Sequence, residues 1–166
     1  MNKADPLRSL MHRAGALLAR RAYSRGQLRD KLAPHADPPQ IEAALDRLQQ
    51  LNLLNDADYA YNSAVRWIKQ EGWGAYKVRH RLLLRQIPEH TAEAAIERVR
   101  QEISDARALA DYLDRRERTQ PLPDDRKGIH KLIMSLRRRG FPEEAIWNVL
   151  RRRIPAASWQ KFEPGD

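Results

Sequence analysis

Cysteine is absent from this 166-residue chain, and strand-forming residues are scarce. The lack of cysteine excludes disulfides, thiolate metal sites and a cysteine nucleophile. Only 4 Val and 2 Thr stand against 22 Ala, 20 Leu and 24 Arg, whereas strands favour β-branched and aromatic side chains. No apolar run approaches the roughly 20 residues that cross a bilayer, and the run 14–19 is too short for a secretion signal. We therefore predict an all-α, cytoplasmic protein without membrane contact.

Catalytic motifs are also missing. The five histidines do not pair at helical spacing, and the sequence has neither a zinc-protease motif nor a Gly-rich phosphate loop. No serine lies in the Gly-x-Ser-x-Gly context of a nucleophile. Asp56 and Asp58 are the closest carboxylate pair, and their position fits the capping of a helix. The sequence thus predicts a protein that is not an enzyme and has no cofactor and no metal.

Charge is the informative part of the composition. The chain has 31 Lys and Arg against 22 Asp and Glu, which leaves a net charge of +9. A positive field of this size attracts nucleic acid, an anionic membrane surface or an acidic protein. Arginine outnumbers lysine by 24 to 7, which suits bidentate contacts with phosphate or carboxylate. Codon bias in a GC-rich genome explains that ratio equally well.

Apolar residues follow helical spacing along the chain and predict nine helices in three groups of three. The pattern returns about every fifty residues: in the middle helices, Leu28, Val78 and Ile129 are 50 and 51 residues apart. In the last helices, Leu45 and Ile96 are 51 apart. A fixed period with matching polarity indicates a tandem array. We predict repeats over 1–54, 55–104 and 105–153, followed by a tail over 154–166.

The repeats are expected to form an elongated, curved array, because three short helices enclose a small core and lean on their neighbours. A single closed nine-helix bundle is the alternative. Small-angle scattering separates the two shapes. We expect a radius of gyration clearly above the roughly 15 Å of a compact chain of this length, and a value close to that figure would contradict the array.

The middle helix of the second repeat carries a basic stripe. Lys77, Arg81 and Arg85 lie at i, i+4 and i+8 and share one face. Like charges at this spacing oppose helix formation by roughly 0.2–0.5 kcal/mol per pair, which favours an anionic partner over a merely solvated face. With the aromatic turn before this helix and the middle helices of the other repeats, the candidate binding residues are Arg25, Arg29, Lys31, Trp73, Tyr76, Lys77, Arg79, Arg81, Arg85, Lys127, Lys131 and Arg138.

Four segments together resemble the bacterial RecX regulators of the RecA recombinase. They are ALLARRAYSRGQLRDKL at 16–32, LNDADYAYNSAVRW at 54–67, EGWGAYKVRHRL at 71–82 and KLIMSLRRRGFPEEAIWNVL at 131–150. The similarity covers about 16–152. The chain departs from the family pattern at Asn55, where an acidic residue is usual, and in a Pro-rich link over residues 33–40.

The resemblance implies tandem three-helix units that bind the RecA filament on DNA, act in DNA repair by homologous recombination and in the SOS response, and suppress ATP hydrolysis and strand exchange without being enzymes. It implies a monomer, and either single-stranded or double-stranded DNA as a further contact. Two other readings remain open. A transcription regulator would use the units as helix-turn-helix modules and prefer particular duplex sequences, whereas a helical-repeat scaffold would bind an acidic protein without DNA.

Overall fold

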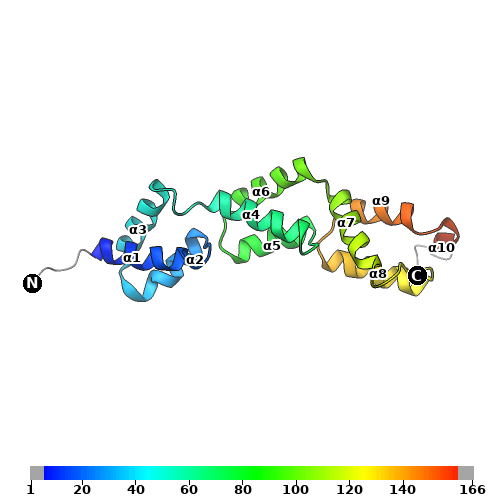
Figure 1. Ribbon diagram of the computed structural model, residues 1–166, viewed down its shortest axis with the longest axis horizontal. Coiled ribbons are helices and arrows are strands. Elements are labelled where there is room, and N and C mark those ends of the chain that lie inside the picture. The colour runs from blue at the N-terminus through cyan, green and yellow to red at the C-terminus, as the bar shows by residue number, and fades with distance from the viewer. Residues whose placement is uncertain (1–5, 161–166) are drawn as a thin grey trace, which may run out of the picture. The chain divides into compact units, whose positions relative to one another are not determined.

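The computed structural model describes residues 6–160, and all regular elements in that range are helical. Three groups of three helices follow one another along the chain (Figure 1), which confirms the predicted all-α fold with tandem three-helix units. The bounds are α1 Pro6–Leu18, α2 Arg25–Leu32, a 3-10 turn Ala33–His35, α3 Pro38–Gln50, α4 Asp56–Lys69, α5 Ala75–Leu84, α6 Glu89–Glu102, α7 Asp105–Glu117, α8 Arg126–Arg138, α9 Glu143–Arg153 and the short α10 Ala156–Gln160.

Backbone contacts divide the chain into two compact units. Of the described residues, the first unit holds 6–62 and 81–95, and the second holds 63–80 and 96–160. The divisions fall inside α4, α5 and α6, so each of these three helices contributes residues to both units. The repeat boundaries at 54 and 104 remain a prediction.

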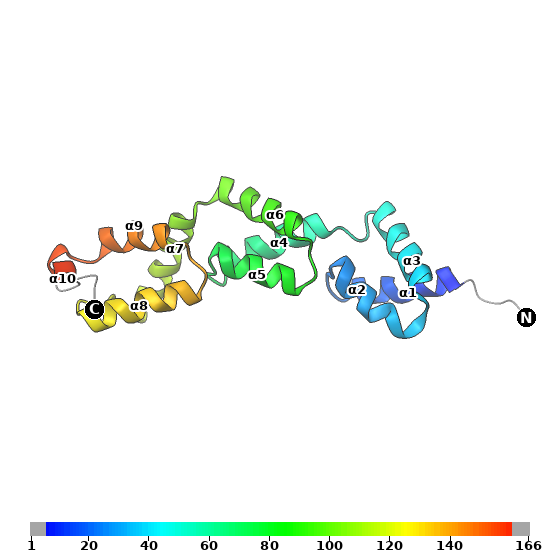
Figure 2. The same cartoon turned by 180° about the vertical axis from the view of Figure 1, so that it is seen from behind.

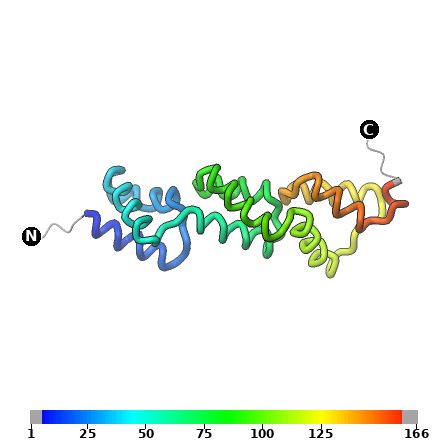
Figure 3. Tube along the Cα trace, turned by 90° about the horizontal axis from the view of Figure 1, so that it is seen from above, coloured from blue at the N-terminus to red at the C-terminus, as the bar shows by residue number. Residues whose placement is uncertain are grey.

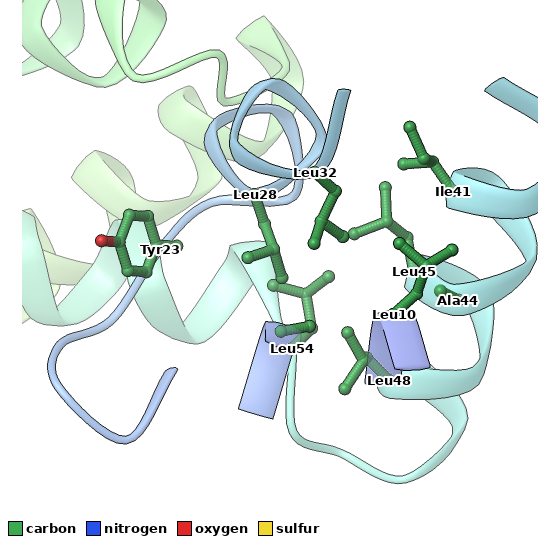
Figure 4. Packing of buried hydrophobic residues seen from close by; sticks show 10 residues of the cluster. Leu10, Tyr23, Leu28, Leu32, Ile41, Ala44, Leu45, Leu48 and Leu54 are labelled. Atoms are coloured by element: carbon green, nitrogen blue, oxygen red, sulfur yellow. The ribbon is translucent and has the colours of Figure 1, made fainter. Parts of the chain in front are cut away.

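The core of the first unit is made by leucines that α1, α2 and α3 bury against one another. Leu28 and Leu32 of α2 point toward Leu45 and Leu48 of α3, and Leu10 of α1 joins them (Figure 4). None of the five side chains is more than 3% exposed. Burying one leucine stabilises the fold by roughly 1.5–3 kcal/mol, so this cluster fixes α2 against its neighbours. Figure 2 shows the same three helices from behind.

Ser24 with Gln27 three residues later has the spacing that predicts a capping box, and the start of α2 confirms it. Ser24 Oγ accepts a hydrogen bond from the Gln27 backbone N–H at 3.1 Å, and Gln27 Oε1 accepts one from the Ser24 N–H at 3.3 Å. The ninth helix begins one residue later than the sequence predicts. Proline is favoured at the first helical position, so the sequence predicts that Pro142 starts this helix, but Pro142 is the N-cap and α9 begins at Glu143.

The start of α4 differs from the sequence prediction in its capping residue. Asp56 and Asp58 lie in the first turn, where carboxylates suit the helix dipole. The cap itself is Asn55, whose Oδ1 accepts hydrogen bonds from the N–H groups of Ala57 at 3.0 Å and Asp58 at 3.1 Å. Asp56 Oδ1 instead accepts one from the Arg25 N–H at 2.7 Å. Asn55, which replaces the acidic residue usual in the family, therefore caps the helix, because an amide oxygen accepts hydrogen bonds at this position as well as a carboxylate does.

The segment after α9 is predicted to be a tail, but its first part is folded. The rings of Trp159 in α10 and Trp147 in α9 lie 5.8 Å apart, and Trp159 Nε1 donates to the Ile154 carbonyl at 3.2 Å. Residues 161–166 of that predicted tail lie outside the described range.

Candidate functional site

The turn before α5 packs against the end of α8. The Gly74 N–H donates to the Arg139 carbonyl at 2.8 Å, and the Tyr76 N–H donates to the Gly140 carbonyl at 3.1 Å. A Cβ on Gly74 would clash with the backbone of Gly140, and one on Gly140 would clash with the backbone of Lys77. Gly140 also has a φ of +85°, a left-handed conformation that glycine adopts without steric cost. Two glycines thus fix where α5 begins.

The two candidate aromatic residues at this turn have different surroundings. Trp73 is half-buried, and its ring stacks on that of the buried Trp67 with centroids 5.4 Å apart. Lys77 Nζ lies 4.3 Å from the centre of the Trp73 ring, a cation–π contact worth roughly 0.5–1 kcal/mol near the surface. Tyr76, in contrast, is 62% exposed. Trp73 therefore positions Lys77, and Tyr76 is the ring that a partner can reach.

The rest of the α5 stripe also divides into engaged and exposed residues. Arg85 is half-buried, and its Nη1 donates to the Tyr59 hydroxyl at 3.2 Å. Arg79 is half-buried, while Arg81 is exposed. Arg81 is thus the best placed of the predicted stripe residues to meet a partner.

The predicted α2 cluster is largely neutralised within the molecule. Arg25 Nη2 lies 2.6 Å from Glu42 Oε2 and 2.7 Å from Asp46 Oδ1, and Arg29 Nε lies 2.5 Å from Glu42 Oε1. Lys31 is exposed. The structure therefore gives Arg25 and Arg29 an internal role, and of these three residues Lys31 is the one left for a partner.

Two carboxylates near Arg25 have shifted pKa values, each for a different reason. Hydrogen bonds from Arg29 and Arg25 lower the pKa of Glu42 to about 2. Burial raises the pKa of Asp56, and outweighs the hydrogen bond from the Arg25 N–H and the nearby positive charges. The pKa of Glu42 is thus lowered, whereas the pKa of Asp56 is raised.

We expect Glu42→Gln to reduce the acid sensitivity of folding. Because the folded-state pKa of Glu42 is depressed, its contribution is present above the unfolded value of 4.5 and is lost as pH falls toward about 2. Glu42 is 39% exposed, so solvent screening limits that contribution to about 1 kcal/mol. Urea unfolding at pH 7 and pH 2.5 measures it. An unchanged difference between the two pH values in the variant would contradict this assignment.

The candidate residues of α8 are all on its solvent side. Lys127, Lys131 and Arg138 are exposed. Their neighbour Arg137 pairs with Glu143 at 2.6 Å. The three exposed cations lie at i, i+4 and i+11, which keeps them on one side of the helix, so this face remains available to an anionic partner.

Arg139 is a key residue of the site's framework that the sequence did not single out. Its guanidinium carbon lies 4.3 Å from the centre of the Tyr112 ring. Its Nη1 donates to the carbonyls of Glu71 at 3.1 Å and Gly72 at 3.3 Å. These partners are distant in the sequence, so no sequence pattern indicated that they would contact Arg139.

Two further observations bear on function. Within residues 6–160, no group of three or more His, Asp or Glu side chains is placed to hold a metal ion. None of the helices described is both long and apolar enough to cross a membrane.

Comparison with known proteins agrees with the four resembling segments. Residues 11–48 match the first three-helix domain of RecX. A "Regulatory protein RecX" from Leptothrix cholodnii is 37% identical over 150 residues, which are 88% of this chain and 90% of that protein. The chain belongs to the RecX family of regulatory proteins. A RecX protein from Chlorobaculum tepidum is 33% identical over 83% of this chain and 84% of its own length.

Solved RecX structures share the fold. The crystal structure of RecX from Lactobacillus salivarius superimposes with a TM-score of 0.74 at 22% identity, over 90% of this chain and 97% of that one. A second crystal structure, of a regulatory protein RecX, gives a TM-score of 0.72 at 23% identity, over 90% of this chain and 74% of the other. These likenesses confirm the helical architecture.

Proposed function

We propose that this RecX-family protein is a negative modulator of RecA that binds the RecA filament on DNA through the basic face of α5. It lowers ATP hydrolysis and strand exchange by RecA, acts in the cytoplasm as a monomer and catalyses no reaction itself. The observation that carries the proposal is the coverage of nearly the whole chain by proteins named as RecX regulators. The net charge of +9 supports an anionic partner.

The exposed residues of α5 support the location. Arg81 and the Tyr76 ring are open to solvent, and the glycine turn fixes the start of the helix that carries them. An exposed guanidinium can form hydrogen bonds with a carboxylate or phosphate of a partner without any rearrangement of the fold. Such charge-assisted contacts are the stronger class of hydrogen bonds.

We expect the wild-type protein to inhibit the ATPase of RecA on single-stranded DNA at no more than near-stoichiometric amounts, and the Lys77→Ala/Arg81→Ala/Arg85→Ala variant to inhibit much less. A matched control removes the same three charges at the exposed Arg13, Arg20 and Arg115 and should inhibit like wild type. Wild-type protein that neither binds the filament nor changes ATP turnover would reject the function. A triple variant equal to wild type would reject only the site.

The salt dependence of binding identifies what α5 contacts. If the three side chains meet phosphate, the log–log salt dependence should flatten by roughly 0.7–0.9 for each phosphate that the variant no longer neutralises. If they meet acidic side chains of RecA, filament binding falls while binding to naked DNA barely changes. Because Lys77 and Arg85 have internal contacts, Arg81→Glu is the cleaner single test, since Arg81 is exposed. A marked preference for one duplex sequence would instead favour a transcription regulator.

A further inference from the structure

A second charged surface lies at helices α7 and α9 and shares no residue with α5. Helices α7 and α9 pack side by side (Figure 3). Between them is a hollow of about 410 Å³, lined by Arg107, Arg152 and Arg153 and by the small side chains of Ala106, Ala110 and Val149. Three cations and no carboxylate line this hollow.

The three arginines differ in what already holds them. Arg153 is fixed, because its guanidinium lies 2.6 Å from Asp114 and 2.8 Å from Glu117 and donates to the Ala110 carbonyl at 3.2 Å. Arg107 pairs with Asp111 at 2.9 Å, yet 73% of its side chain is exposed. An exposed pair one helical turn apart is weak and easily exchanged.

Arg152, on α9, is exposed. The hollow therefore presents two guanidiniums, those of Arg107 and Arg152, that can turn toward a ligand. They come from opposite walls of the hollow, whereas the charge of Arg153 is already paired with Asp114 and Glu117.

Arg107 is also a wall of a neighbouring hollow of about 530 Å³. This one has the apolar side chains of Ile68, Ile103 and Ala108 and a balanced set of charges, including the Lys69–Glu102 pair at 3.1 Å. Along this surface, a hollow lined by arginine side chains thus gives way to one lined by charges of both signs and by apolar side chains, with Arg107 at the division.

We infer that the two hollows together dock a protein segment in which acidic residues adjoin apolar ones. The carboxylates would pair with Arg107 and Arg152, and bidentate guanidinium–carboxylate geometry suits that role. The apolar side chains would cover Ile68 and Ile103. Nucleic acid fits less well, because a uniform polyanion continuing past Arg107 would meet Asp111 and Glu102 in the second hollow, and neither hollow is lined by an aromatic side chain on which bases could stack.

The test selects the ligand without presupposing its sequence. A library of random 12-residue peptides displayed on phage is panned against the full-length protein, and enriched peptides are synthesised with a fluorophore. Their affinities are measured for wild type, for Arg107→Ala/Arg152→Ala, and for Arg115→Ala. Arg115 is an exposed arginine of the same helix α7 that lines neither hollow, so it is the matched control. A fluorescent oligo-dT serves as the nucleic-acid probe.

We expect enriched peptides to combine Asp or Glu with apolar residues. Their binding should weaken about tenfold or more in the double variant and stay unchanged in the control, while oligo-dT binding changes less than about twofold. Enriched peptides without acidic residues, or equal binding by the double variant, would overturn the inference. If the double variant weakens oligo-dT binding as much as peptide binding, the surface is a nucleic-acid site instead. None of these results depends on RecA, so the test is independent of the proposed function.

Discussion

Replacing Gly140 by alanine is expected to lower the free energy of unfolding by about 2–4 kcal/mol. The added Cβ would clash with the backbone of Lys77, which cannot move away without disturbing α5. The φ of +85° at this position adds strain for any side chain. Both effects act at the junction of α5 and α8, so the variant should also weaken partner binding through α5.

The control for this variant is Gly15→Ala in α1. A Cβ at Gly15 meets nothing within 4 Å, and alanine is favoured over glycine inside a helix by roughly 1 kcal/mol. Urea unfolding followed by circular dichroism should therefore show a gain for Gly15→Ala and a loss for Gly140→Ala. Equal stabilities of the Gly140 variant and wild type would mean that the two turns are not closely packed.

Ser24→Ala is expected to cost about 2–3 kcal/mol. The Ser24 side chain is fully buried and has two roles at once. It caps α2 by accepting from the Gln27 N–H, and its hydroxyl donates to the carbonyl of Arg85 at the end of α5. Alanine removes the cap and leaves a carbonyl without its donor.

Ser104→Ala separates the two roles of Ser24. Ser104 caps α7 by accepting from the Arg107 N–H at 3.2 Å, but it is exposed. Loss of that cap alone should cost about 1 kcal/mol. The excess loss at Ser24, measured by urea unfolding, is then the contribution of its bond to Arg85. Equal losses for the two variants would show that this bond adds nothing to stability.

The local elements were predictable because their causes are local. Helical spacing of leucines located the helices, and Ser24 with Gln27 three residues later located the start of α2. The fifty-residue period located the three groups. The sequence predicted Pro142 as the first helical residue, whereas it is the N-cap of α9. The two positions are hard to tell apart, since proline is acceptable at both.

The internal neutralisation of the predicted site was not predictable, because it depends on distant partners. Nothing near Arg25 in the sequence shows that Glu42 and Asp46 will meet it. The same holds for Arg139. In the sequence it is one of three consecutive arginines and looks like the other two, and only the folded structure brings it to Tyr112 and the Gly72 carbonyl. Sequence alone therefore ranked the basic residues by spacing, and the structure ranks them by which are still exposed.

The hydrogen bonds from the N–H groups of Gly74 and Tyr76 to the end of α8 determine which fragments of the protein can be expressed without disturbing α5. The first N–H groups of a helix have no acceptor within the helix, and here two of them find theirs on residues more than sixty positions later. A fragment ending at residue 104 would contain all of α5 but would lack the carbonyls that accept these two hydrogen bonds. It would also expose the side of Gly74 that packs against Gly140. The period that is so regular in the sequence is thus not a unit that can be excised without loss. Expression fragments that retain α8 together with α5 keep the helix start intact.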